Sequence, residues 1–350
     1  MRRGVGLGVA ALGLDALAAC VPQGAAAPAA ATLPPPETKS VRLFYALCDP
    51  PFWMAGDFLR EEGFAGGLDT VSGPLLQLSL TSVLTGAADI GVSFANTFVG
   101  AVDAGFPVVA LGGIHPGCAQ LWARPGINTI SDLKGKTVAV PPKTISANGK
   151  TSPSTIFSFF VALLAHVGIE PGAVNFVELA ANANAFEAFV AGKSDAFLAQ
   201  AEGGTLLQAN PKNPGRLILD TTMDKPWSQE FCCLLVANRT WATANPVAAK
   251  RATRALLRSA DAVTKDRRAA PSAALATGLY KASPEITEAV VADTIKDLSY
   301  DWRGYDPEET VRFFALRLSD AKLIGKTPQE IITAGTDFAY FRQLRTELKA

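Results

Sequence analysis

A supersecondary pattern that occurs twice along the chain constrains the fold more than any other feature. Each copy reads strand, loop, helix, strand, helix and strand, and a glycine-containing turn precedes the last strand. The turns begin at Gly86 and Gly192, and the apolar runs after them are 90–94 and 196–199. A glycine here ends a helix in the left-handed conformation, and the apolar runs have the length of buried parallel strands.

The other elements of the two copies follow from the same periodicities. The expected strands are 41–47, 68–72 and 90–94 in the first copy and 136–140, 174–179 and 196–199 in the second. The expected helices are 51–62 and 75–85, then 153–167 and 184–191. Alternating strands and helices indicate open parallel sheets with ligand loops at the carboxyl ends of the strands. We therefore expect an α/β protein whose two lobes face each other across a cleft.

Two β-rich runs, 107–124 and 231–238, are placed to carry the chain between the lobes. The sequence after Asn245 is helical, and several helices begin with proline after a capping residue. These helices are 247–263, 269–281, 284–298, 307–319 and 328–348, and we expect them to pack on the first lobe and behind the hinge. Lobe 1 is then 41–119 plus 231–350, and lobe 2 is 120–230.

The N-terminus predicts export. Arg2 and Arg3 precede an apolar stretch that ends at Leu17-Ala18-Ala19-Cys20, which is typical of a signal peptide (1–20) with a lipobox. Cys20 would then carry the lipid; the alternative is an ordinary cleavage in the alanine-rich sequence up to Ala31. Residues 21–40 are rich in alanine and proline and cannot bury a core, so they predict a tether. The expected location is the periplasm or the cell surface, at a membrane.

Composition excludes one class of partner and supports two domains. Lys plus Arg and Asp plus Glu each number 32, so no basic surplus exists to bind a phosphate backbone, and nucleic acid is not expected. A chain of 350 residues is long enough for two lobes of ordinary size. After the first 20 residues no apolar run reaches the roughly 18 to 20 residues of a membrane helix.

Several stretches resemble one family of binding proteins. They are GAADIGVSFAN, INTISDLKGKTVAV, VGIEPGAVNFVEL, FVAGKSDAFLAQAE and GTDFAYFRQLRTELKA, and the most specific part is 132–136. Together they resemble the nitrate/sulfonate/taurine-type branch of periplasmic solute-binding proteins, which includes thiamine-pyrimidine-precursor binders. The resemblance covers residue 41 to the end. It implies a two-lobed type II periplasmic binding fold, an ABC permease of the inner membrane as partner, and a small-molecule ligand; we expect a monomer.

Candidate ligand-binding residues follow the strands of both copies. Asp49 can accept donors, while Trp53 either stacks on a planar ligand or belongs to the core. Asn96 can cap a helix that starts at the cleft, and the equivalent helix start in the second copy offers Ser152, Ser154 and Thr155. Capping alone is the alternative for these residues. Four further candidates are Glu202 after the last strand of the second copy, Trp227 and Gln229 before the return crossover, and His115 on the first crossover.

The cysteines leave several states open. Cys48, Cys118, Cys232 and Cys233 should all gather near the hinge, as disulfides or as free buried thiols. Because neighbours on a strand face opposite sides, at most one of Cys232 and Cys233 should line the cleft. His115 lies near thiols, but no Cys-x-x-Cys or His-x-x-x-His spacing is present, so neither a metal nor a cofactor is expected.

Two other functions compete with transport. An enzyme on the same fold would use Cys48 as nucleophile with His115 as base, as in a desulfinase, or a cysteine cluster, as in the related pyrimidine synthases. The export signal and the missing cysteine and arginine motifs of those families disfavour both, so we expect no enzyme. The third possibility is a ligand sensor that feeds a receptor. The ligand can be a sulfonate, a carboxylate, a pyrimidine or another aromatic; the absence of arginine from the assigned loops disfavours a multiply charged anion.

Overall fold

The computed structural model describes Met1 and residues 33–44, 48–65, 69–70, 80–276 and 287–349. Residues from Leu33 onward belong to one compact unit, and the description below concerns that unit. The predicted signal peptide and Cys20 lie outside the described residues. Within the described residues no helix combines the length and the apolar character that a membrane span requires.

Sheet A holds the strands of the first copy together with the two long crossover strands. Its order is β2-β1-β3-β12-β4, with bounds Asp69–Thr70, Arg42–Phe44, Ile90–Phe94, Phe231–Asn238 and Val108–Pro116. β1 pairs parallel with β2 and β3, whereas β12 pairs antiparallel with both β3 and β4. The crossover strands therefore complete the sheet instead of merely linking the lobes.

Sheet B holds the strands of the second copy. Its order is β11-β5-β10-β6-β9, with bounds Arg216–Asp220, Ala119–Ala123, Ala196–Gln200, Thr137–Val140 and Asn175–Glu178. β6 pairs parallel with β9 and β10, but β5 runs antiparallel to β10 and β11. The expectation of wholly parallel sheets was wrong, because each sheet includes one crossover strand that runs antiparallel to its neighbours. This strand is β12 in sheet A and β5 in sheet B.

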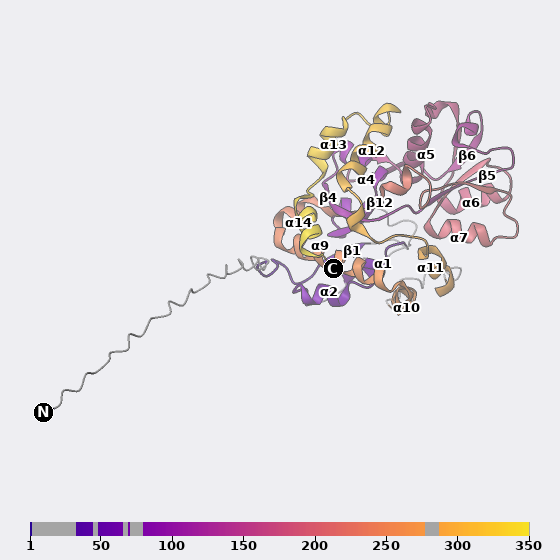
Figure 1. Cartoon of the computed structure of the whole chain (residues 1–350). Coiled ribbons are helices and arrows are strands. Elements are labelled where there is room, and N and C mark those ends of the chain that lie inside the picture. Colours follow the sequence, from indigo (N-terminus) through magenta and orange to yellow (C-terminus); the bar gives the residue numbers. More distant parts are fainter. Residues whose placement is uncertain (2–32, 45–47, 66–68, 71–79, 277–286, 350) are drawn as a thin grey trace. The chain divides into compact units, whose positions relative to one another are not determined.

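The helices of the two copies lie close to their expected places. In the first copy they are α1 (Pro50–Trp53), α2 (Gly56–Glu61), α3 (Thr81–Thr85) and α4 (Ala95–Asp103). In the second they are α5 (Thr155–His166), α6 (Asn182–Val190) and α7 (Ala201–Ala209), which surround β5 and β6 in Figure 1. Gly86 ends α3 at φ 77°, and Gly192 follows α6 at φ 78°, so both turns contain the left-handed glycine that the repeat predicts.

A hairpin stands where the sequence analysis expected a polar loop. β7 (Thr144–Ala147) and β8 (Lys150–Pro153) pair antiparallel around Asn148 and Gly149. Both turn residues have positive φ, 49° and 73°, as a two-residue turn of this kind requires. Asn-Gly between alternating residues was the signal in the sequence, and it was missed.

The described chain after β12 is helical, as expected, but the end of the expected helix 269–281 and the start of the expected helix 284–298 lie outside the described residues. Its helices are α8 (Arg239–Ala244), α9 (Pro246–Lys265), α10 (Ala270–Ala276), α11 (Glu288–Ile295), α12 (Pro307–Asp320), α13 (Pro328–Gly335) and α14 (Ala339–Glu347). The expected helix 328–348 is divided because the backbone N–H of Asp337 donates to the carbonyl of Ala110 at 2.9 Å. The described residues also form five 3-10 turns, which are Ile130–Leu133, Pro171–Ala173, Trp227–Gln229, Arg267–Ala269 and Trp302–Gly304.

The described end of the predicted tether is held by α9. The carboxylate of Glu37 accepts the N–H groups of Val247 and Ala248 at 2.9 and 2.8 Å, which satisfies free donors at the start of the helix. Arg251 donates to the carbonyl of Pro34 at 2.7 Å. A free tether can therefore comprise at most residues 21–32 of the expected 21–40.

The hydrophobic core is continuous between the two sheets. One cluster of buried side chains includes Leu235 of β12 and also Val138 and Leu198 of sheet B. A smaller cluster contains the neighbouring strand residues Trp122 and Phe197, which point to the other face of sheet B. The sheet of the second copy is therefore covered by apolar side chains on both faces.

Candidate functional site

The first turns of α4 and α5 contact each other through hydrogen bonds. The side-chain amide of Asn96 donates to the carbonyl of Thr155 at 2.8 Å and to the hydroxyl oxygen of Ser158 at 2.7 Å. The hydroxyl of Thr97 donates to the hydroxyl oxygen of Thr155 at 2.9 Å. The structure therefore brings together predicted residues from both copies of the repeat.

Two polar atoms at this contact have no hydrogen-bond partner among the described residues. They are Oδ1 of Asn96 and Oγ of Ser154, and both side chains are buried. Ser154 is the N-cap residue of α5, but its hydroxyl does not cap the helix. A buried polar atom without a partner costs about 1 to 3 kcal/mol, so two of them at one place suggest a ligand.

The expectation that Asn96 caps its helix was wrong. α4 begins at Ala95 and its N-cap residue is Phe94, so Asn96 lies inside the first turn and its side chain is directed at α5. Ser158 was missed by the sequence analysis. Its position one helical turn after Ser154 was the available signal, because residues four apart share a helix face.

A glycine allows α4 to approach the hairpin before α5. A Cβ atom on Gly100 would lie 3.0 Å from Oγ of Ser152 and 3.1 Å from Cδ of Pro153. Ser152 is buried by this contact, with 1% of its surface exposed. The predicted residue Ser152 thus lies against α4, and its hydroxyl donates to the carbonyl of Pro153 at 3.4 Å.

Glu202 lies in the first turn of α7, directly after β10. Burial raises the pKa of its carboxyl to about 7, and the electrostatic influence of Cys48 acts in the same direction. Near neutral pH, Glu202 can exist as a protonated carboxyl that donates a hydrogen bond.

Asp49 and His115 form a buried pair. Nε2 of His115 lies 3.3 Å from Oδ1 of Asp49, and both side chains are inaccessible to solvent. Nδ1 of His115 donates to the carbonyl of Pro116 at 3.0 Å. Although burial lowers the pKa of His115, Cys233 and Asp49 raise it well above its usual value overall.

The remaining predicted site residues lie in different environments. Trp53 is 3% exposed and belongs to the main core cluster. Trp227 is also 3% exposed, and its ring lies 5.8 Å from Phe159 and 5.2 Å from Phe313. Gln229 is exposed at the end of the same 3-10 turn. Trp227 therefore packs between α5 and α12, and a role in ligand contact stays a prediction.

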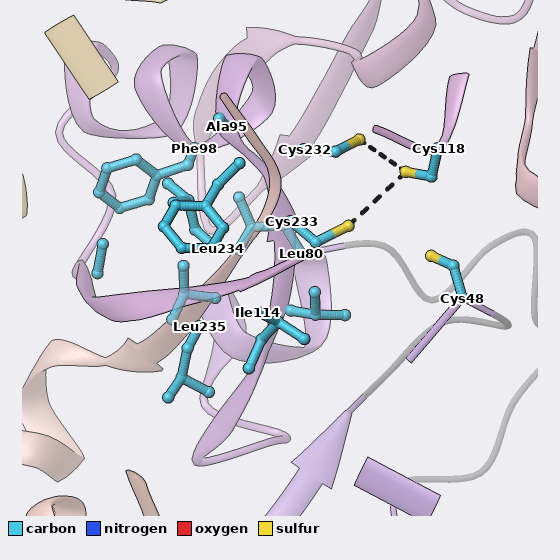
Figure 2. Close-up of a cluster of buried hydrophobic side chains, with 14 of the residues drawn as sticks. Cys48, Leu80, Ala95, Phe98, Ile114, Cys118, Cys232, Cys233, Leu234 and Leu235 are labelled. Carbon is cyan, nitrogen blue, oxygen red and sulfur yellow. Dashed lines mark hydrogen bonds between the residues drawn. The ribbon is translucent and has the colours of Figure 1, made fainter. Parts of the chain in front are cut away.

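The four cysteines of the described chain gather as expected, but not with the expected alternation. Sγ of Cys118 lies 2.6 Å from Sγ of Cys232 and 3.9 Å from Sγ of Cys233 (Figure 2). Both neighbours thus face Cys118, so the expectation that they point to opposite sides was wrong. The register of β12 against β4 shifts between Phe231 and Cys233, and a bulge of this kind rotates one residue out of the alternation.

The electrostatics of these thiols do not favour a nucleophile at Cys48. A hydrogen bond with Cys118 lowers its pKa, but the effects of Cys233 and of burial prevail and raise it. The thiolate is the reactive form, so a raised pKa reduces reactivity. Burial raises the pKa of Cys232, but hydrogen bonds from Cys118 and Cys233 outweigh it and lower the value to about 6.

Family membership follows from the sequence profile. The family model described as NMT1/THI5 like matches residues 60–270, which is more than half of the chain. The chain belongs to the NMT1/THI5-like family. The matched part of this NMT1/THI5-like protein includes both helix starts, Glu202 and the segments that carry Cys118 and Cys233. No curated protein matches the sequence significantly.

Solved structures share the fold of this NMT1/THI5-like protein. The alkanesulfonate-binding protein SsuA from Xanthomonas axonopodis pv. citri, bound to MOPS, is 19% identical, with a TM-score of 0.63 over 87% of this chain and 99% of that one. The nitrate-binding protein NrtA from Synechocystis PCC 6803 is 12% identical, with a TM-score of 0.66 over 90% of each chain. The Escherichia coli aliphatic sulphonate binding protein SsuA is 18% identical, with a TM-score of 0.59 over 84% and 92%. The expected α/β fold of periplasmic binding proteins is confirmed.

Proposed function

We propose that this protein is an extracytoplasmic solute-binding protein of an ABC importer, and that it binds a small organic molecule between two lobes. The observation that carries the proposal is the contact between the first turns of α4 and α5. There, buried Oδ1 of Asn96 and buried Oγ of Ser154 have no partner among the described residues. The similarity to structures of sulfonate- and nitrate-binding proteins supports the same function.

The free atoms specify the chemistry of the ligand. Both amide hydrogens of Asn96 are already donated, so only its Oδ1 remains for the ligand, and an amide oxygen accepts a hydrogen bond. The hydroxyl of Ser154 can donate to a carboxylate, a sulfonate or a ring carbonyl. A pyrimidine that carries N–H beside a carbonyl offers both partners. Segments 94–97, 152–158 and 200–202 contain no arginine, which disfavours a multiply charged anion.

A panel of ligands with a matched pair of variants tests this site. The panel comprises an alkanesulfonate, a carboxylate and a pyrimidine, and the readout is the rise in melting temperature. Ser154→Ala removes the hydroxyl at the proposed site, whereas Ser259→Ala removes a buried hydroxyl on α9 that also has no partner among the described residues. At 100 times the Kd, a ligand adds about 2.7 kcal/mol of stability. Ser154→Ala should weaken the apparent affinity at least tenfold and so reduce the rise in melting temperature, whereas Ser259→Ala should leave both unchanged. An equal rise in melting temperature in both variants would exclude Ser154 from the site.

The proposal includes export and anchoring. A lipid on Cys20 and a short tether would hold the protein at a membrane, in the periplasm or at the cell surface, where a monomer can deliver its ligand to the permease. Mass spectrometry of the N-terminal peptide should show a diacylglycerol adduct on Cys20. Cys20→Ser should release the protein from the membrane fraction, and unchanged association with the membrane would contradict the anchor.

The two lobes are proposed as residues 41–119 plus 231–350 and residues 120–230. All strands of sheet A lie within the first set of residues. All strands of sheet B lie within the second, apart from Ala119, the first residue of β5. Ligand would stabilise the closed arrangement, so small-angle scattering should give a smaller radius of gyration at saturating ligand. An enzyme that uses Cys48 is disfavoured, because the pKa of this buried thiol is raised.

A further inference from the structure

Four potential metal ligands from separate parts of the chain converge at one place. Cys48 follows β1, His115 is the penultimate residue of β4, Cys118 lies between β4 and β5, and Cys233 is in β12. One ligand atom from each lies within 4.8 Å of the others, and all four side chains are buried. Three of these segments belong to sheet A or its loops, and Cys118 leads directly into sheet B.

We propose that Cys48, Cys118, Cys233 and His115 bind one zinc ion in a closed, four-coordinate site. Three thiolates with one imidazole form a donor set that is typical of structural zinc. With Zn–S distances of about 2.3 Å, tetrahedral geometry places two sulfur atoms about 3.8 Å apart. The observed 3.9 Å between Cys118 and Cys233 already matches this edge.

The backbone prepares His115 for such a role. Its Nδ1 donates to the carbonyl of Pro116, so in the neutral ring the lone pair is on Nε2. A carbonyl that holds one ring nitrogen is the usual second partner of a metal-binding histidine. Asp49 faces Nε2 at 3.3 Å, and the ion would replace the proton as the positive charge opposite that carboxylate.

Neighbouring groups also fix Cys48. The phenol of Tyr300 donates to the carbonyl of Cys48 at 2.9 Å, and the same ring packs edge-on against His115 with 5.4 Å between centroids. Tyr300 is fully buried. A rigid second layer of this kind holds two of the four ligands in place before the ion binds.

A disulfide between Cys118 and Cys232 is the competing use of these sulfur atoms, since they are 2.6 Å apart. This disulfide would use only Cys118 and Cys232. It would not explain why Cys48, Cys233 and His115 also converge there. Zinc accounts for all of these residues and requires only that Cys118 turn from Cys232 toward the ion. The site would join the loop after β1 to both crossover strands, and so would stabilise the junction from which sheet B begins.

Metal analysis of the purified full-length chain tests the site without reference to any transported ligand. After preparation under reducing conditions and dialysis against metal-free buffer, zinc should be present at about one ion per chain. Cobalt in its place should give the intense visible absorption of a tetrahedral thiolate complex. Cys48→Ser and Cys118→Ser should each reduce bound zinc at least tenfold, whereas the control Cys232→Ser should retain it.

Three results would overturn the proposal. They are wild-type protein with almost no zinc, equal zinc in wild type and Cys48→Ser, and loss of zinc in Cys232→Ser with a Cys118–Cys232 disulfide in the wild type. If a serine variant does not fold, the wild type still decides the question. Its melting temperature should rise with added zinc and fall again with a chelator, and no change would count against the site.

Discussion

The side-chain amide of Asn96 lies 2.7 Å from the hydroxyl oxygen of Ser158, and this hydrogen bond joins the first turn of α4 to the first turn of α5. The hydroxyl of Ser158 in turn donates to the carbonyl of Ser154 at 2.7 Å. Ser158 thus connects the amide that crosses between the helices to the cap of its own helix. The proposed ligand site depends on this connection, because it fixes the direction of Oδ1 of Asn96.

Variants at this pair should show energetic coupling. Asn96→Ala and Ser158→Ala should each lower the free energy of unfolding by about 1 to 3 kcal/mol, because each leaves a buried polar group without its partner. The double variant should lose less than the sum, with a coupling energy of about 0.5 to 3 kcal/mol. Urea unfolding of the four proteins measures the cycle. Strict additivity would mean that the bond contributes nothing to stability.

Gly117 should not tolerate a side chain. Its φ is +47°, and a Cβ atom would clash with the carbonyl oxygen of Thr221, which directly follows β11. Gly126→Ala is the control, since Gly126 also has positive φ but nothing within 4 Å of its Cβ position. Gly117→Ala should lower the free energy of unfolding by at least ~1 kcal/mol more than the control. If thermal or urea unfolding gives the same loss of stability for Gly117→Ala and Gly126→Ala, the segments that contain Gly117 and Thr221 can move apart.

Glu202 should make stability fall with rising pH. Burial raises its pKa from the ordinary 4.5 to about 7, so between these values the folded chain holds a proton that the unfolded chain has released. The stabilisation is complete below about pH 4.5 and is lost as the pH rises through about 7. Glu202→Gln should therefore give a flatter dependence of melting temperature on pH between 5 and 7. Burial also raises the pKa of Glu230, to about 6, so in the variant Glu230 still causes a smaller decrease of stability with rising pH. Parallel curves for wild type and variant would contradict the raised pKa of Glu202.

Trp227 should contribute strongly to stability. Its ring contacts Phe159 and His166 of α5 and Phe313 of α12, and Arg317 lies over its face. Trp227→Ala should lower the free energy of unfolding by about 3 to 5 kcal/mol in the absence of ligand. Trp241→Ala, at a partly buried tryptophan of α8, should cost clearly less. A Trp227→Ala protein with parental stability but weaker ligand binding would instead identify Trp227 as a wall of the ligand site.

The sequence by itself determined the order of the elements and the fold class. The turns at Gly86 and Gly192 are readable because only a left-handed residue ends a helix in this way, and the prolines at positions 246, 307 and 328 mark helix starts for an equally local reason. The helix starts near Asn96 and Ser154 were also predicted as site segments, because the repeat places them at equivalent ends of strands. Asn-Gly at 148–149 carried the hairpin signal as well.

Only the tertiary structure decided how these segments meet. The bond from Asn96 to Ser158 joins residues 62 positions apart, and the bulge that turns both Cys232 and Cys233 toward Cys118 depends on the register of β12 against β4. Local spacing gave no metal motif, because the four ligands come together only when β4, β12 and the segments that carry Cys48 and Cys118 converge. Periodicity specifies which face of an element is buried, but the partner across that face is set by packing and register, which no single segment contains.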